Sequence, residues 1–192
     1  SFAPTVLTYE PTAADERLPC TMAEIWTGAD IQIFEHQPDT TIMQSVHTVD
    51  LEEDDLRPGS EAQALLKFDL ASIAGCGEVV SAELSFCTLD NSFAEVSGTK
   101  MLVDWGESDT WNSLGGGCAG VSDHIAQNAS FEFTPGDFTK VTVDVTADVQ
   151  GWHDGSINSG WCLRAKSTDG WDYKTLHNDD CKPTLTVFFA PR

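Results

Sequence analysis

Tryptophan is the side chain of this sequence best suited to hold a sugar. The chain has six tryptophans against only two tyrosines, and a flat aromatic ring offers a large contact area at a low cost in conformational entropy. Trp26 and Trp171 lie among glycine and polar residues, as exposed loop residues do. Tyr173 follows Trp171 by two positions, so on an extended segment both rings face the same side. We predict that Trp26, Trp171 and Tyr173 contact a glycan; the alternative is that they anchor loops to the core.

Carboxylates could bind a hard cation, because acidic residues outnumber basic ones by 31 to 10 and the net charge is -21. This balance disfavours nucleic acid and anionic membranes as partners, since both require basic patches. Two explanations of the acidity stay open: a soluble surface suited to salty water, or calcium binding through clustered carboxylates. The candidate calcium ligands lie in the first third of the chain and just before its last strand: Asp30, Asp39, Asp50 to Asp55, Asp179 and Asp180.

Catalytic chemistry has weaker support. The five histidines form no HxH or HExxH motif, so no zinc or copper site is expected. No GxSxG nucleophile motif occurs. Paired carboxylates of a glycoside hydrolase depend on spacing in the folded chain, and a lyase-like pair of Tyr173 and His177 is conceivable. We expect a non-catalytic protein and keep a polysaccharide lyase or hydrolase as the alternative.

Six cysteines without a CxxC pair predict three disulfides and therefore an extracellular protein: Cys20, Cys76, Cys87, Cys118, Cys162 and Cys181. Of the many possible connectivities we favour one pair, Cys162 with Cys181, on either side of a turn-like segment at 169–172. The opening residues lack the charged and apolar regions of a signal peptide, so we expect a secreted chain whose leader has been removed. No apolar run is long enough to span a membrane. Asn128 begins a glycosylation sequon.

The elements that must position these residues are mostly short strands. Alternating apolar and polar residues predict strands at 30–33, 66–70, 82–86, 102–105, 141–145, 161–165 and 185–189. One short helix is expected where Val145, Val149 and Trp152 have helical spacing, with Thr146 as its cap. Residues 50–59 are expected to form an acidic loop. We predict an irregular N-terminal arm over 1–21 and an all-β sandwich of jelly-roll type, with one short helix, over 22–192.

Seven segments form a distinctive ordered series along the chain: 29–31, 65–73, 80–84, 105–112, 143–152, 158–163 and 182–187. In this order they resemble the DNRLRE (disaggregatase-related) family, which includes alginate-binding carbohydrate-binding modules, and residues 29–31 resemble its opening strand. The resemblance implies a jelly-roll sandwich that acts outside the cell and is usually non-catalytic. It also implies that Trp105, Trp111 and Trp152 are structural, and that Asp30 with Asp179 or Asp180 could hold a calcium ion.

These observations lead us to expect an extracellular carbohydrate-binding module. Four basic residues of its C-terminal third could form a local groove for an acidic polysaccharide, which the overall charge would otherwise repel: Arg164, Lys166, Lys174 and Lys182. The alternative is a structural subunit of an extracellular matrix, sheath or filament. In that case the arm over 1–21 would reach a neighbouring copy of the chain and add a strand.

Overall fold

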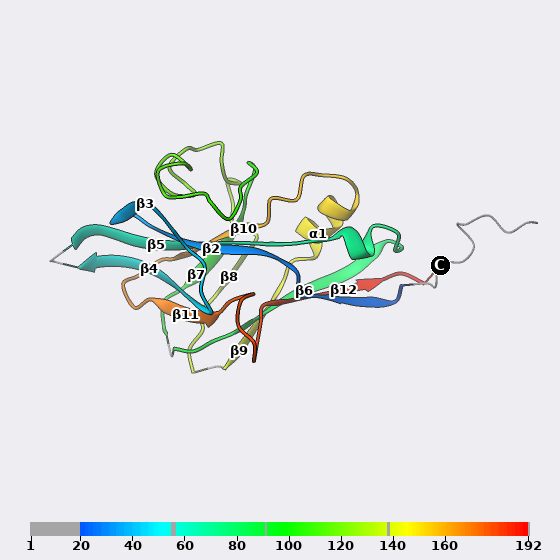
Figure 1. Cartoon of the computed structure of the whole chain (residues 1–192). Coiled ribbons are helices and arrows are strands. Elements are labelled where there is room, and N and C mark those ends of the chain that lie inside the picture. Colours follow the sequence, from blue (N-terminus) through cyan, green and yellow to red (C-terminus); the bar gives the residue numbers. More distant parts are fainter. Residues whose placement is uncertain (1–19, 55–56, 91, 138, 192) are drawn as a thin grey trace, which may run out of the picture.

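The computed structural model describes residues 20–54, 57–90, 92–137 and 139–191. Two antiparallel sheets pack against each other (Figure 1). The smaller sheet has the order β1-β12-β6-β9, and the larger one has the order β11-β4-β5-β10-β7-β8, with β2 beside β5 and β3 beside β2. The strands are β1 Met22–Ile25, β2 Gly28–Phe34, β3 Gln37–Ile42, β4 Val46–Asp54, β5 Arg57–Phe68, β6 Val79–Cys87, β7 Val96–Lys100, β8 Phe131–Phe133, β9 Lys140–Asp144, β10 Trp161–Ala165, β11 Trp171–Lys174 and β12 Thr184–Phe189. The predicted all-β sandwich is confirmed.

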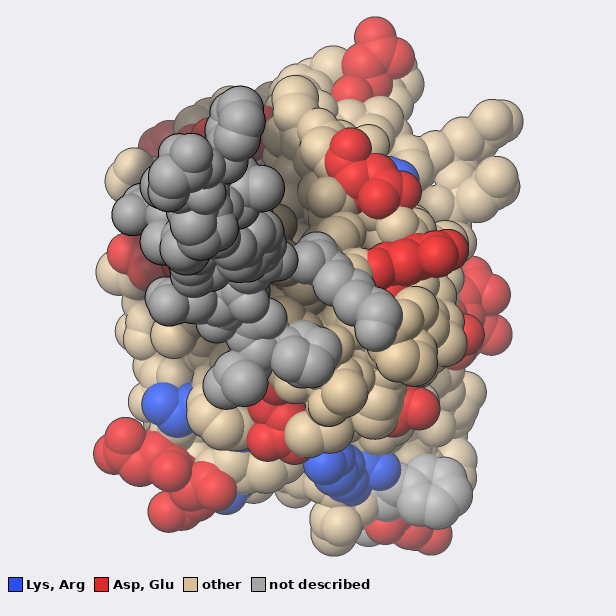
Figure 2. Space-filling view, turned by 90° about the vertical axis from the view of Figure 1, so that its right-hand side faces the viewer, with Lys and Arg blue, Asp and Glu red and all other residues tan. Residues whose placement is uncertain are grey.

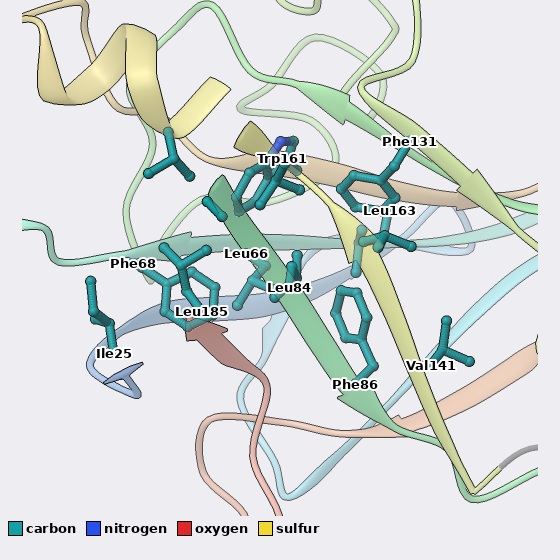
Figure 3. Close-up of a cluster of buried hydrophobic side chains, with 14 of the residues drawn as sticks. Ile25, Leu66, Phe68, Leu84, Phe86, Phe131, Val141, Trp161, Leu163 and Leu185 are labelled. Carbon is teal, nitrogen blue, oxygen red and sulfur yellow. The ribbon is translucent and has the colours of Figure 1, made fainter. Parts of the chain in front are cut away.

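The main core lies between the two sheets. Alternate residues of β5, β6 and β12 point into it, including Leu66, Phe68, Leu84, Phe86 and Leu185, which are at most 2% exposed (Figure 3). These strands have the two-residue periodicity that the sequence shows, because one face of each meets the opposite sheet. The sequence pattern therefore places the core correctly for these strands.

A second apolar cluster covers the outer face of the larger sheet. Ile31 and Ile33 of β2 pack there against Trp105 and Trp111 from the long segment that follows β7. This segment is the green loop above the sheet in Figure 1. Strand β2 is consequently buried on both faces, and its polar residues, among them Asp30, point into the protein. Trp105, Trp111 and Trp152 are buried, as expected for structural tryptophans.

Helix α1 spans Thr146–His153 and packs Val149 and Trp152 into the core. Its predicted cap is wrong: the Thr146 hydroxyl accepts a hydrogen bond from the backbone N–H of Ala82, and the carboxylate of Asp144 accepts one from the N–H of Thr146. Hydrogen bonding to the side chain of Thr146, and next to its backbone N–H, lowers the pKa of Asp144. A single turn of 3₁₀-helix, η1, covers Ala71–Ile73. Within the described ranges, no helix is long and apolar enough to cross a membrane.

Three segment assignments made from the sequence need correction. Strands β4 and β5 run through most of the expected acidic loop at 50–59 and pair as a hairpin, so cross-strand hydrogen bonding overrides the low strand propensity of acidic residues. The expected strand at 102–105 is absent; β7 ends at Lys100. The expected turn at 169–172 is partly strand β11, paired with β4. Of the predicted arm over 1–21, residues 1–19 lie outside the described residues.

All six cysteines form disulfides, as predicted. The pairs are Cys20–Cys76, Cys87–Cys181 and Cys118–Cys162. The expected pairing of Cys162 with Cys181 is wrong. Cys162 lies on β10 in the larger sheet and meets the long segment over its outer face, whereas Cys181 precedes β12 and bonds to the end of β6. Three disulfides fit an extracellular protein.

Candidate functional site

Trp26 lies at a shallow pocket of about 370 Å³. Its side chain is 53% exposed, which confirms the sequence expectation of an accessible ring. Strand β1 ends at Ile25 opposite Leu185 of β12, so Trp26 comes next to Thr184 at the start of β12. The pocket is lined by Trp26, Cys87, Lys140, Asp179, Asp180, Cys181, Lys182 and Thr184.

The pocket unites four segments that are distant in the sequence. Lys140, the first residue of β9, pairs with Cys87 at the end of β6. The Cys87–Cys181 disulfide then joins β6 to the loop that holds Asp179 to Lys182. The loop is shaped by the side-chain oxygen of Asn178, which accepts hydrogen bonds from the backbone N–H groups of Asp180 (3.0 Å) and Cys181 (3.2 Å). The disulfide and these bonds fix the pocket wall before any ligand binds.

The two lysines of the pocket are exceptional in this acidic protein. Five other described basic residues lie within 4 Å of a carboxylate: Lys67, Lys100, Arg164, Lys166 and Lys174. Lys140 and Lys182 have no carboxylate partner within the part of the chain that the structure describes, and both line the pocket of Trp26. The two lysines without such a partner among the described residues therefore line the same pocket as the exposed indole ring.

The pocket also has acceptors. Asp179 and Asp180 are exposed, and Asp180 lies 3.8 Å from the ammonium of Lys174. A sugar carries several hydroxyl groups, each of which both donates and accepts hydrogen bonds. Carboxylates and ammonium groups around an aromatic ring can thus engage a sugar hydroxyl from either side.

Trp171 and Tyr173 lie elsewhere and cannot stack on a glycan, because both side chains are fully buried. They do face the same side of β11, as the two-residue spacing predicts, but that side is the core. Each ring meets the ring of Phe86 edge to face, with centroids 5.3 and 5.5 Å away. Burial, and next the charge of Asp30, raise the pKa of Tyr173 well above its usual value.

The three basic residues expected to form a groove, Arg164, Lys166 and Lys174, each lie within 4 Å of a carboxylate. Arg164 donates to Glu61 at 2.9 Å, and Lys166 pairs with both Glu95 and Glu132. Figure 2 shows acidic side chains spread over one face, with few basic ones among them. Of the basic residues named from the sequence, Lys182 alone lines the Trp26 pocket.

The four predicted metal ligands occupy different surroundings. Asp39 is exposed and accepts a hydrogen bond from the side chain of Asn112 at 2.8 Å. Asp179 and Asp180 line the Trp26 pocket. Asp30 is fully buried and accepts a hydrogen bond from the backbone N–H of Leu176 at 2.6 Å. Among the described residues, no group of three or more His, Cys, Asp or Glu side chains stands in metal-binding geometry.

A larger open groove of about 1020 Å³ lies beside helix α1. Its most buried carboxylate, Asp148, accepts a hydrogen bond from the indole N–H of Trp161 at 2.7 Å and lies 3.2 Å from the ammonium of Lys100. Asp148 thus has structural partners. Asn128 also lines this groove and is exposed, as a glycosylated asparagine must be.

Comparison with known proteins adds no relative. No protein-family model matches the chain, and no curated protein is similar enough to count as one. The resemblance to the DNRLRE family therefore rests on the ordered sequence segments, and the function must be argued from the site.

Proposed function

We propose that this protein is an extracellular, non-catalytic carbohydrate-binding domain that holds a glycan in the pocket of Trp26. The observation that carries the proposal is the convergence of a half-exposed tryptophan with two lysines that have no carboxylate partner among the described residues. An exposed indole next to fixed polar groups is the usual arrangement of a sugar subsite. The three disulfides fit the extracellular setting.

The two pocket lysines, Lys140 and Lys182, affect which glycans the pocket can bind. A net charge of -21 repels an acidic polysaccharide at long range, but that repulsion is screened within about 8 Å at physiological ionic strength. Lys140 and Lys182 line the pocket of Trp26 and can supply positive charge to a sugar bound there. We therefore include acidic polysaccharides, such as uronate polymers, with neutral matrix glycans among the ligands.

Calcium would act in this proposal as a bridge between the protein and an acidic glycan. Asp179 and Asp180 supply carboxylate oxygens at the pocket, and oxygen is the ligand that calcium prefers. A cation held there would link the protein to an acidic glycan, so binding assays with and without a chelator separate calcium-dependent from direct recognition.

The test is a glycan array followed by calorimetry on the ligands found. Trp26→Ala should weaken binding by about tenfold or more, which corresponds to about 1.4 kcal/mol. Phe93→Ala is the matched control, because Phe93 is another exposed aromatic residue, 73% accessible, outside the pocket. Absence of binding to every neutral and acidic glycan, with or without calcium, would contradict the proposal.

A structural subunit is the second candidate function, and one edge of the smaller sheet favours it. Among the described strands, β1 lies at the edge of the smaller sheet. Its Met22 lies opposite Phe188 of β12, and these side chains are 51% and 37% exposed. An edge strand with apolar residues can pair with another copy of the chain. Analytical ultracentrifugation and imaging test this: a strictly monomeric protein that binds a glycan rules out the assembly role.

A further inference from the structure

Around Asp30, several buried polar atoms have no hydrogen-bond partner among the described residues. One oxygen of the buried carboxylate, Oδ2, accepts the hydrogen bond from Leu176. The other, Oδ1, has no well-formed hydrogen bond. It lies 3.1 Å from Nε2 of His177 and 3.7 Å from Nε2 of His47. Two imidazole nitrogens from different parts of the chain therefore approach the same oxygen.

His47 is the least satisfied of these groups. Its side chain is fully buried, and neither ring nitrogen has a hydrogen-bond partner among the described residues. The ring is held by Tyr173, which lies directly opposite it in the β4–β11 pair, with ring centroids 6.0 Å apart in an edge-on arrangement. A buried polar group without a hydrogen-bond partner is unfavourable. A ligand bound to Nε2 of His47 would supply the interaction that this nitrogen lacks.

The donor atoms fit one class of ion. One carboxylate and two neutral imidazoles are typical ligands of a zinc-class divalent ion, with a water molecule in the fourth position. Ligand atoms on a tetrahedral zinc ion are about 3.3 Å apart, given bonds of about 2.0 Å. The two observed separations, 3.1 and 3.7 Å, lie on either side of this value.

We propose that Asp30, His47 and His177 bind a divalent transition-metal ion of the zinc class. The three side chains do not stand in metal-binding geometry, so binding requires them to draw together around the ion. His177 is 40% exposed and gives the ion a path from solvent. The ion would join β2, β4 and the segment between β11 and β12, which also carries Asp179 and Asp180 of the Trp26 pocket.

The experiment uses the full chain after treatment with a chelator and removal of the chelator. Calorimetric titration with ZnCl₂ should show one ion per chain and a higher Tm, because an ion that binds only the folded state stabilises it. Titration with CoCl₂ should produce the visible absorption bands of tetrahedral Co²⁺. CaCl₂ should give neither signal, since calcium prefers oxygen ligands.

His177→Ala is the decisive variant, because its partly exposed side chain can be removed with little effect on the core. It should weaken Zn²⁺ binding by at least tenfold and abolish the Co²⁺ bands. His36→Ala is the matched control, since His36 is exposed and outside the cluster, and it should bind as the unaltered chain does. Failure of the unaltered chain to bind Zn²⁺, or equal affinity in His177→Ala, would overturn the proposal. Either result is independent of glycan binding.

Discussion

Replacing Tyr173 with phenylalanine should change how stability depends on alkaline pH. The hydroxyl of Tyr173 is buried and has no hydrogen-bond partner among the described residues. Burial and the charge of Asp30 raise its pKa in the folded protein well above the usual value, whereas the unfolded chain titrates near 10. Above about pH 10 the unfolded chain therefore loses this proton while the folded protein keeps it.

The sign and size follow from proton linkage. A folded pKa above the unfolded one gives stability that is complete below about pH 10 and declines as pH rises toward the folded pKa. At pH 11 the loss from Tyr173 alone is about 1.4 kcal/mol relative to neutral pH, and it grows by about 1.4 kcal/mol for each further unit. Tyr173→Phe removes this contribution. At neutral pH it also removes an unpaired buried hydroxyl, so the variant should be at least as stable.

The assay is urea unfolding at pH 7, 9, 10 and 11, followed by tryptophan fluorescence with a chelator present. Both proteins share every other titrating group, so the difference between their free energies of unfolding isolates Tyr173. We expect the difference to grow in favour of Tyr173→Phe from pH 10 upward. Parallel pH profiles would refute the argument from burial, and a variant less stable by more than 1 kcal/mol at pH 7 would show that the hydroxyl has a partner.

Three further predictions concern a disulfide, a buried hydrogen bond and the glycosylation sequon. Replacing Cys118 and Cys162 with alanine should lower the free energy of unfolding by about 4 kcal/mol in chemical denaturation, because the disulfide closes a loop of 44 residues. Asp148→Ala should cost about 1–3 kcal/mol in the same assay, because it leaves the buried indole N–H of Trp161 without an acceptor; an unchanged midpoint would contradict this. Secretion from a host that glycosylates asparagine should add the mass of a glycan at Asn128, and Asn128→Gln should remove it.

The sequence correctly predicts the strands that bury only one face, against the opposite sheet. Strands β6 and β12 show clean alternation because one face meets the opposite sheet, and Leu84 and Leu185 are buried as expected. Strand β2 is different. Its outer face is covered by Trp105 and Trp111, which follow much later in the chain. Its polar positions, including Asp30, then point into the protein, and no local pattern could reveal this.

The candidate site was predictable only in part, because it too depends on contacts between segments that are far apart in the sequence. Trp26 is exposed, as its polar surroundings indicate. Asp179 and Asp180, which the sequence suggested as calcium ligands together with Asp30, instead line the pocket of Trp26. Trp171 has similar neighbours in sequence but lies on β11, whose pairing with β4 turns its ring into the core. The contribution of Lys140 was missed, because only the β6–β9 register and the Cys87–Cys181 disulfide bring it to the pocket.

Glycan binding by Trp26 is tested by calorimetry of the unaltered chain and of Trp26→Ala with the best ligand from a glycan array. The titration is done with and without calcium, with Phe93→Ala as the control. The predicted result is saturable binding that Trp26→Ala weakens about tenfold or more and that Phe93→Ala leaves unchanged. Equal affinity in the unaltered chain and Trp26→Ala would contradict the account.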